Sequence, residues 1–312
     1  MKKLIGFMAA GLLLAGCSDD NDSGNSQTPV IPLGQVTLQS ATPDNAAVSV
    51  PAVSKTEYDN ASAANIRTAV LTFANGQVLT FSTNKTKQNA ALTKIEGSAE
   101  SITVPSAVTL GNEVFTVDSI GIPDLVPSLL CETVREITLP STIKSSASTY
   151  TQRLNNFPNL NSVRMEAGFS GFVSINGAVY TADMKKFIYC PLGRDGEFSI
   201  ADGTETICSR AFDPESRIIR VVIPASMKEI EDEAFLYNNS LQVVNILATT
   251  APVARERAFG YYARRATLVI PQGCRASYIV ARPAENADES AQFNYDNHKG
   301  YTFFETVSEY KY

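Results

Sequence analysis

The chain has 312 residues, of which 44% are hydrophobic and 19% are charged, with 18 Gly and 15 Pro. This length suits one large domain or two ordinary ones, and the hydrophobic fraction excludes a wholly disordered chain. When residues 1–16 are removed, 24 basic residues remain against 32 acidic ones, which gives a net charge of −8. Such a surface repels phosphate backbones, so we expect no nucleic acid partner.

Residues 1–17 have the pattern of a secretory signal peptide, with two lysines at the start and the apolar run Leu4–Ala15. At 1.5 Å per residue, this run is too short to cross a hydrocarbon core of about 30 Å. The run ends in Leu14-Ala15-Gly16-Cys17, which resembles the lipobox of bacterial lipoproteins. The resemblance implies that Cys17 takes a diacylglycerol and anchors the protein to a membrane. The alternative is an ordinary secreted protein in which Cys17 is removed or unused.

Residues 18–35 begin with a polar stretch that cannot bury enough surface to offset chain entropy, so we expect a flexible tether. Its acidic start resembles the surface-export signal of lipoproteins in Gram-negative bacteria of the Bacteroidota kind. This resemblance implies an outer-membrane protein that is exposed at the cell surface. Asp20 and Asp22 have the spacing of the first calcium ligands, but Ile31 occupies the position of the bidentate glutamate, which excludes a calcium loop.

Residues 36–91 are predicted to form a small β-rich cap region. Two apolar runs, 69–73 and 78–81, flank Asn75-Gly76, and this dipeptide favours a type I′ turn between antiparallel strands. The cap would cover the first open edge of the repeats that follow. A separate adhesive module is the alternative, although the segment is short and lacks a long core pattern of its own.

A repeat of about 23 residues organises the C-terminal half. The dipeptide Ala-Phe occurs at intervals of 23 and 24 residues, at 211–212, 234–235 and 258–259. Isoleucines recur in the same register, at positions 200, 223, 246 and 270. A fixed period of this length is typical of a solenoid, in which each unit buries its apolar face only by stacking on its neighbours.

Within one unit, Arg220–Ile223 is predicted to form a short strand that ends at Pro224, which has no N–H to continue a strand ladder. The apolar positions predicted to turn inward after this strand are Met227, Ile230, Ala234 and Phe235. The charged residues between them are expected on the solvated side of the coil.

These residues resemble the BspA-like leucine-rich repeat, in which Ile-Pro, Ile, Ala-Phe, Leu and Val recur in this order. Here the pattern reads Ile223-Pro224, Ile230, Ala234-Phe235, Leu241 and Val244. The resemblance covers residues 92–281, including Val114–Gly121, which resembles the stretch that opens such arrays. It implies a right-handed curved leucine-rich-repeat solenoid of short strands with irregular or short helical returns, on proteins used for adhesion at bacterial surfaces. Residues 282–312 fit no repeat and are expected to form a C-terminal cap.

No catalytic set can be assembled from the sequence, so we expect no enzyme, no metal and no other cofactor. The cysteines after Cys17 form no CxxC pair and lack zinc spacing: Cys131, Cys190, Cys208 and Cys274. Cys190 and Cys208 either face each other on successive coils as a disulfide or are small buried hydrophobes of the repeat. His298, the only histidine, lies in a polar stretch and is expected at the surface of a loop.

One cluster is a candidate for partner binding. Arginine and tyrosine, the residue types that carry interface hot spots, crowd around Phe259. The candidate patch consists of Arg255, Arg257, Tyr261, Tyr262, Arg264 and Arg265. The alternative is an ordinary exposed loop whose tyrosines pack on their neighbours.

The sequence therefore predicts a lipid-anchored cell-surface protein that binds a protein or glycan partner, in adhesion or ligand recognition, through one face of a solenoid. Many modest contacts would add up over a large area. The alternative is a structural or accessory lipoprotein of an outer-membrane assembly or a nutrient-uptake complex. Periodicity by itself establishes only the solenoid.

Overall fold

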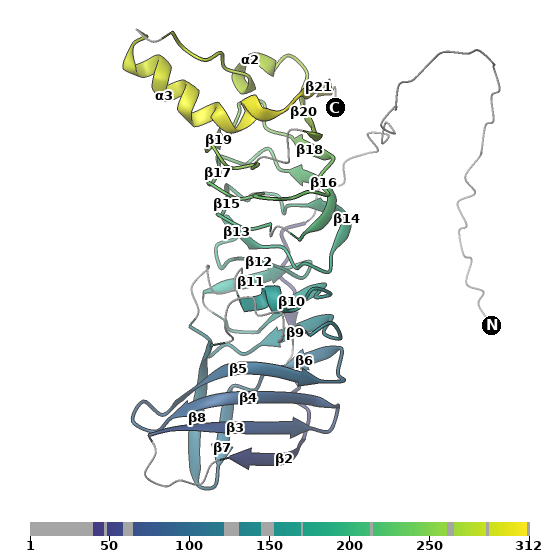
Figure 1. The fold of residues 1–312 in the computed structure, drawn as a ribbon, viewed down its shortest axis with the longest axis vertical. Helices are drawn as coiled ribbons and strands as arrows, with labels where there is room; N and C mark the ends of the chain where they lie inside the picture. The colour runs from purple at the N-terminus through teal and green to yellow at the C-terminus, as the bar shows by residue number, and fades with distance from the viewer. Residues whose placement is uncertain are drawn as a thin grey trace, which may run out of the picture. The chain divides into compact units, whose positions relative to one another are not determined.

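Figure 1 shows the computed structural model of the chain, which describes residues 40–46, 49–58, 65–121, 131–144, 153–169, 171–212, 215–260, 265–284 and 287–310. All of these residues belong to one unit, Thr37–Tyr312. The predicted signal peptide (1–17), with Cys17, and the predicted tether (18–35) lie outside the described residues.

The N-terminal part forms a six-stranded sheet in the order β2-β3-β4-β5-β8-β7. Its strands are β2 (Val53–Tyr58), β3 (Ile66–Phe73), β4 (Gln77–Asn84), β5 (Asn89–Gly97), β7 (Ala107–Leu110) and β8 (Glu113–Ile120). Every second residue of β4 is buried, and β3 alternates in the same way. This alternation is what a sheet shows when one of its faces covers an apolar core.

The predicted hairpin between β3 and β4 is confirmed, but the type I′ turn is wrong. A type I′ turn needs a positive φ at both central residues, whereas Gly76 has a φ of +88° and Asn75 does not have a positive φ. The amide N–H of Gly76 donates to the carbonyl oxygen of Phe73 at 3.0 Å. Three residues therefore connect the strands, and the last of them is a glycine in the left-handed region, as in hairpins with a bulge.

The sheet extends beyond residue 91, where the cap was expected to end. β8, whose sequence resembles the opening of a repeat array, pairs in parallel with β5 and antiparallel with β7. β6 (Ser101–Thr103) instead pairs with β9 (Glu136–Leu139), the next strand of the solenoid. One apolar core contains Phe81 of the sheet and Ile137 of the solenoid. The chain enters the solenoid and returns to the sheet, so no single position separates two cores.

The solenoid begins with the sheet β1-β10-β9-β6 and continues as two further ladders. The first sheet contains β1 (Asn45–Ala46), β6, β9 and β10 (Ser162–Glu166), and the short helix η2 (Leu154–Asn156) precedes β10. The second ladder is β14 (Asp195–Ser199), β16 (Arg217–Ile223), β18 (Val243–Ile246), β20 (Thr267–Pro271) and β21 (Thr306–Tyr310). The third is β11 (Phe172–Ile175), β12 (Ala178–Thr181), β13 (Lys186–Tyr189), β15 (Thr206–Ile207), β17 (Glu229–Ile230) and β19 (Val253–Ala254).

The register of these ladders confirms the predicted repeat. Ile223 of β16 aligns with Ile246 of β18, and the two strands run parallel. On the return path of the same coils, Ile207, Ile230 and Ala254 align across β15, β17 and β19. The returns were expected to be irregular or helical, but in these coils they carry a second ladder of two-residue strands, which Figure 1 shows as a separate column.

The recurring phenylalanines form one buried stack. The ring centroids of Phe212 and Phe235 are 4.5 Å apart with 14° between the ring planes, and those of Phe235 and Phe259 are 5.2 Å apart with 12°. Phe187 continues the stack on the preceding coil, 5.1 Å from Phe212. The alanine before each repeated phenylalanine is fully buried, and its small side chain lets adjacent coils approach. The apolar columns predicted from the sequence therefore share one interior.

The C-terminal segment extends the ladder as well as covering it. The helix α2 (Arg275–Tyr278) ends before the predicted cap of residues 282–312, which forms α3 (Glu289–His298) and η4 (Lys299–Phe303) before β21. β21 pairs in parallel with β20, and Tyr301 and Phe304 join the core of the repeats, although this segment fits no repeat in sequence. His298 is not in a loop as expected: it lies half-buried in the last turn of α3, with its ring 6.4 Å from that of Tyr301. Among the helices that the structure describes, none is long and apolar enough to cross a membrane.

Candidate binding surfaces

Arg255 and Arg257 of the candidate patch follow β19, and both are paired with acids of the preceding coil. Arg255 donates from Nε and Nη2 to Glu229 Oε1, at 3.0 and 2.7 Å. Arg257 lies 2.5 Å from Asp232 Oδ2 and 2.7 Å from Glu233 Oε1. Asp232 contributes most to raising the pKa of Arg257, and Glu233 and Glu256 raise it further. Both guanidinium groups are therefore neutralised, and they connect adjacent coils.

The rest of the patch is placed only in part. Arg265 is exposed just before β20, and Tyr261, Tyr262 and Arg264 lie outside the described residues. The patch as a single binding surface stays a prediction, because the tyrosines that would supply most of its contact area are among the residues not described.

Opposite charges alternate along the coils at the repeat spacing. Glu205 lies between Lys228 and Lys185, with Nζ–Oε distances of 2.6 and 2.9 Å. Hydrogen bonds from Lys228 and then Lys185 lower the pKa of Glu205 below its ordinary value. A second column of the same kind consists of Arg210, Glu233 and Arg257. Exposed pairs of this sort contribute little to stability, so their main effect is to fix the order of charges on the surface.

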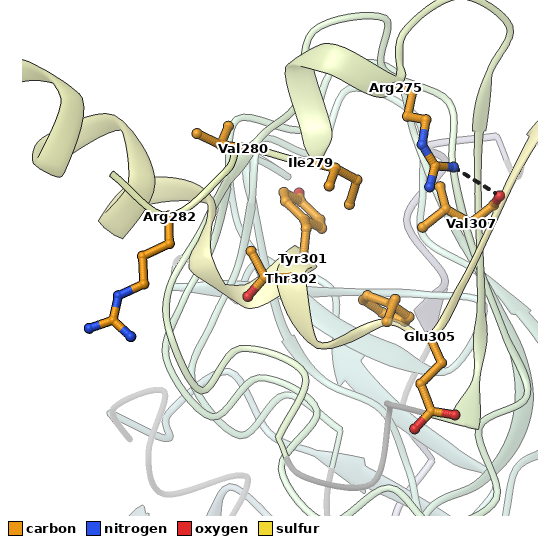
Figure 2. Close-up of a pocket in the computed structure, with 9 residues that line it drawn as sticks. Arg275, Ile279, Val280, Arg282, Tyr301, Thr302, Glu305 and Val307 are labelled. Atoms are coloured by element: carbon orange, nitrogen blue, oxygen red, sulfur yellow. Dashed lines mark hydrogen bonds between the residues drawn. The ribbon is translucent and has the colours of Figure 1, made fainter. Parts of the chain in front are cut away.

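A cavity of 290 Å³ lies at the C-terminal end of the described chain, between α2, η4 and β21 (Figure 2). Ile279, Tyr301 and Phe304 supply its apolar wall. Arg275 donates from Nη1 to the carbonyl oxygen of Val307 at 3.2 Å, which holds α2 against β21 (Figure 2). The contact uses one guanidinium N–H for the fold itself, so we regard the cavity as a packing feature of the last coil.

The interior titratable groups keep their protons at neutral pH. Burial raises the pKa of Tyr301 well above its ordinary value, and its hydroxyl donates to the carbonyl oxygen of Pro252 at 3.1 Å. Burial also raises the pKa of the Cys190 and Cys208 thiols, in each case to about 12. A thiol with such a pKa is not a nucleophile at neutral pH.

No disulfide joins Cys190 and Cys208. All four described cysteines are free, Cys190 and Cys208 included. Cys190 is buried in the core of the C-terminal coils, whereas Cys208 packs against the core that the N-terminal sheet shares with the first coils. These two residues therefore take the alternative role of small hydrophobic positions. Within the described ranges, no group of His, Cys, Asp or Glu side chains is arranged to hold a metal ion.

One group of residues was not expected to be functional from the sequence. Gly193–Gly196 reads as a tight turn, yet Arg194 of this turn lines a polar hollow together with Arg135 and Arg217. The signal in the sequence is an arginine at or directly before the first residue of a strand. Arg135 and Arg194 are 59 residues apart, whereas Arg194 and Arg217 are 23 apart, because the chain between β10 and β14 interrupts the 23-residue period. This unequal spacing conceals the arginine signal.

The parallel ladders, the repeat of 23 residues and the buried phenylalanine stack define the chain as a β-rich solenoid of stacked repeats. No protein-family model matches the sequence, and the comparison with curated proteins gives no match. Three solved structures illustrate what the chain is similar to. The pneumococcal vaccine antigen PcpA has 12% sequence identity and a TM-score of 0.25, and the match covers 84% of this chain and 100% of that one. A leucine-rich cell surface protein from Faecalibacterium prausnitzii A2-165 has 12% identity and a TM-score of 0.29, with 77% of this chain and 94% of that one covered. A leucine-rich repeat protein from Bacteroides ovatus ATCC 8483 has 16% identity and a TM-score of 0.34, with 62% of this chain and 53% of that one covered.

Proposed function

We propose that this protein is a lipid-anchored protein of the cell surface that recognises a protein or glycan partner through its solenoid, in adhesion or ligand recognition. The observation that carries the proposal is the stack of coils on one buried column of phenylalanines. This interior fixes the exposed side chains of successive coils at a constant spacing. Contacts that are modest singly can then add over several coils at little cost in ordering the binding surface.

The proposal includes binding without catalysis. Tyr301, Cys190 and Cys208 are protonated at neutral pH because burial raises the pKa of each, and all three side chains pack in or against the core. The charged columns pair acids with bases one coil away, as Glu205 does with Lys228. These columns present acids and bases in a fixed order along the surface. A partner with the complementary order of charges would be selected by it, because charge complementarity controls specificity and the association rate.

The anchor is a separate part of the proposal, and it depends on Cys17. Cells grown with labelled palmitate should incorporate the label into this protein, and Cys17→Ala should abolish the labelling and release the protein from membranes. Cys274→Ala removes another cysteine that is not fully buried, and it serves as the matched control. Equal labelling of the Cys17→Ala protein would overturn the lipid anchor.

Exposure at the cell surface is tested by protease treatment of intact cells. We expect the protease to degrade this protein while a periplasmic marker stays intact. Protection of both proteins would overturn surface recognition and favour the alternative, an accessory or structural lipoprotein of an outer-membrane assembly or a nutrient-uptake complex. In that case the protein should copurify with an integral outer-membrane component after mild detergent extraction.

A further inference from the structure

A polar hollow of 470 Å³ lies where successive strands of the solenoid begin. Its wall is formed by the starts of β9, β14 and β16 and by the residue directly before β10. The side chains that matter for its chemistry are Arg135, Asn161, Arg194, Asp195, Glu197 and Arg217. The hollow is separate from the candidate patch after β19 and from the cavity at the C-terminal end.

Backbone hydrogen bonds bring these strand starts together. The N–H of Asn161 donates to the carbonyl oxygen of Arg135 at 2.7 Å, and the N–H of Gly193 donates to that of Leu160 at 2.8 Å. A Cβ at Gly193 would lie 2.4 Å from the backbone of Asn159, so only glycine permits this close approach. The result is that arginines from three separate strand starts line one hollow.

The three arginines of the hollow form no ion pair with the described residues. Arg194 donates from Nε to the carbonyl oxygen of Asn161 at 2.9 Å, and its guanidinium lies over the Phe198 ring, 5.5 Å from the centroid. Arg217 donates from Nη2 to the carbonyl oxygen of Pro158 at 2.7 Å. These acceptors are neutral, and each guanidinium retains further N–H groups that can bind a ligand.

Arg135 is the most available of the three. It is exposed, and its side chain has no hydrogen bond or ion pair within the part of the chain that the structure describes. Arg210, Arg255 and Arg257 differ from it, because each of them forms an ion pair with an acid one coil away. The hollow thus gathers three arginines that lack an ion pair among the described residues, on a chain whose net charge is negative.

The carboxylates at the hollow supply the opposite chemistry. Asp195 is exposed and aligns with Arg217 in the ladder, yet the described residues include no ion pair for it. Glu197 pairs with the buried Arg220 at 3.1 Å and remains 44% exposed. A ligand that fits this wall carries an anionic group for the guanidiniums and hydroxyl donors for the carboxylates.

We propose that the hollow binds an acidic saccharide, with the carboxylate or sulfate group of the sugar on the three arginines and its hydroxyls on Asp195 and Asn161. Arginine binds such oxyanions through paired N–H groups, and the volume suits a small ligand. A nucleotide is a poorer match, because Phe198, the aromatic residue of the wall, is buried and covered by Arg194. The inference rests on the surface-recognition function proposed above and names its ligand class.

The test is calorimetric titration of the full-length protein with trigalacturonate, with a chondroitin sulfate oligosaccharide as the sulfated arm and neutral galactotriose as the uncharged control. We expect saturable binding of an anionic sugar, weakened by added salt, and no binding of galactotriose. The relative affinity of the two anionic arms identifies whether carboxylate or sulfate is preferred. Arg135→Ala with Arg217→Ala should weaken binding about tenfold or more, since charge-assisted contacts are lost.

The matched control is Lys55→Ala with Lys94→Ala, which removes the same amount of charge from the N-terminal sheet, where neither lysine lines the hollow. This control should change the affinity less than about threefold, because exposed charges outside the site act mainly through screened, long-range attraction. Equal weakening by both double variants, equal binding of galactotriose, or no binding of either anionic sugar would each overturn the site. The two proposals fail separately, because the titration does not depend on where the protein resides and the protease experiment does not depend on sugar.

Discussion

Phe235 offers the sharpest test of the shared interior. Its ring is fully buried between Phe212, 4.5 Å away, and Phe259, 5.2 Å away. Burial of a phenylalanine side chain contributes about 1.5–3 kcal/mol, and each aromatic pair adds about 0.5–1.5 kcal/mol beyond its area. Phe235→Ala removes both pairs at once and leaves a cavity. We expect the free energy of unfolding to fall by about 4–5 kcal/mol, the upper part of the range for such truncations.

Urea unfolding followed by circular dichroism measures this loss, since the chain contains no tryptophan for fluorescence. Phe235→Leu is the matched control, because it keeps an apolar side chain between the coils and should cost about 1 kcal/mol. Both curves should show one transition, because a break in the ladder that separated the coils would add a second one. A loss below about 1 kcal/mol for Phe235→Ala would refute the stacked interior.

Three further predictions concern Glu205, Cys190 and Gly193. The pKa of Glu205 in the folded protein is lowered below its ordinary value of 4.5, chiefly by Lys228. Glu205 therefore stabilises the fold above pH 4.5, and this stabilisation is lost as the pH falls from 4.5 through the lower folded-state pKa. Melting temperatures recorded between about pH 6 and pH 3 should therefore fall less for Glu205→Gln than for the wild type. The thiol of Cys190, buried and with a pKa of about 12, should react with iodoacetamide only after denaturation. Gly193→Ala places a Cβ 2.4 Å from the backbone of Asn159 and should lower the free energy of unfolding by about 1–3 kcal/mol, measured in urea.

Each of these expectations has a result that contradicts it. An acid-induced loss as large in Glu205→Gln as in the wild type would mean that its lysine pairs are absent in solution. Rapid alkylation of Cys190 in the folded protein would place its thiol at the surface. An unchanged unfolding curve for Gly193→Ala would show that the turn does not approach Asn159. Gly171→Ala is the control, because Gly171 has no positive φ and a Cβ there would make only an ordinary contact with Phe169 at 3.6 Å.

The apolar columns were predictable because the repeat itself dictates them. When Ile223 and Ile246 share a register, every residue at the same offset shares it too, so one recognised period predicts the whole stack. The repeat also predicts the ion pairs between coils, since Glu233 and Arg257 lie one period apart in the sequence. Charges of opposite sign at the repeat spacing would have indicated that Arg257 is already paired.

The pairing of β8 with β5 was not predictable from local pattern. Alternating apolar residues show that Glu113–Ile120 is a strand with one buried face, but they do not identify the partner strand. The C-terminal helix was also missed, because α3 has no clear apolar stripe. Its start did leave a signal: Asp288 is the N-cap, and its side chain accepts a hydrogen bond from the N–H of Ala291 at 2.8 Å.

The arginine hollow shows why a repeat protein can hide a site from its own periodicity. A repeat makes equivalent positions visible only while the interval stays constant, and the antiparallel strands β11, β12 and β13 lengthen one interval. Arg135 and Arg194 line the same hollow, and among the described residues no acid forms an ion pair with Arg135 as Glu233 does with Arg210. Like charges held close together repel, so this part of the solenoid has an electrostatic reason to take up an anion that the ion-paired columns lack.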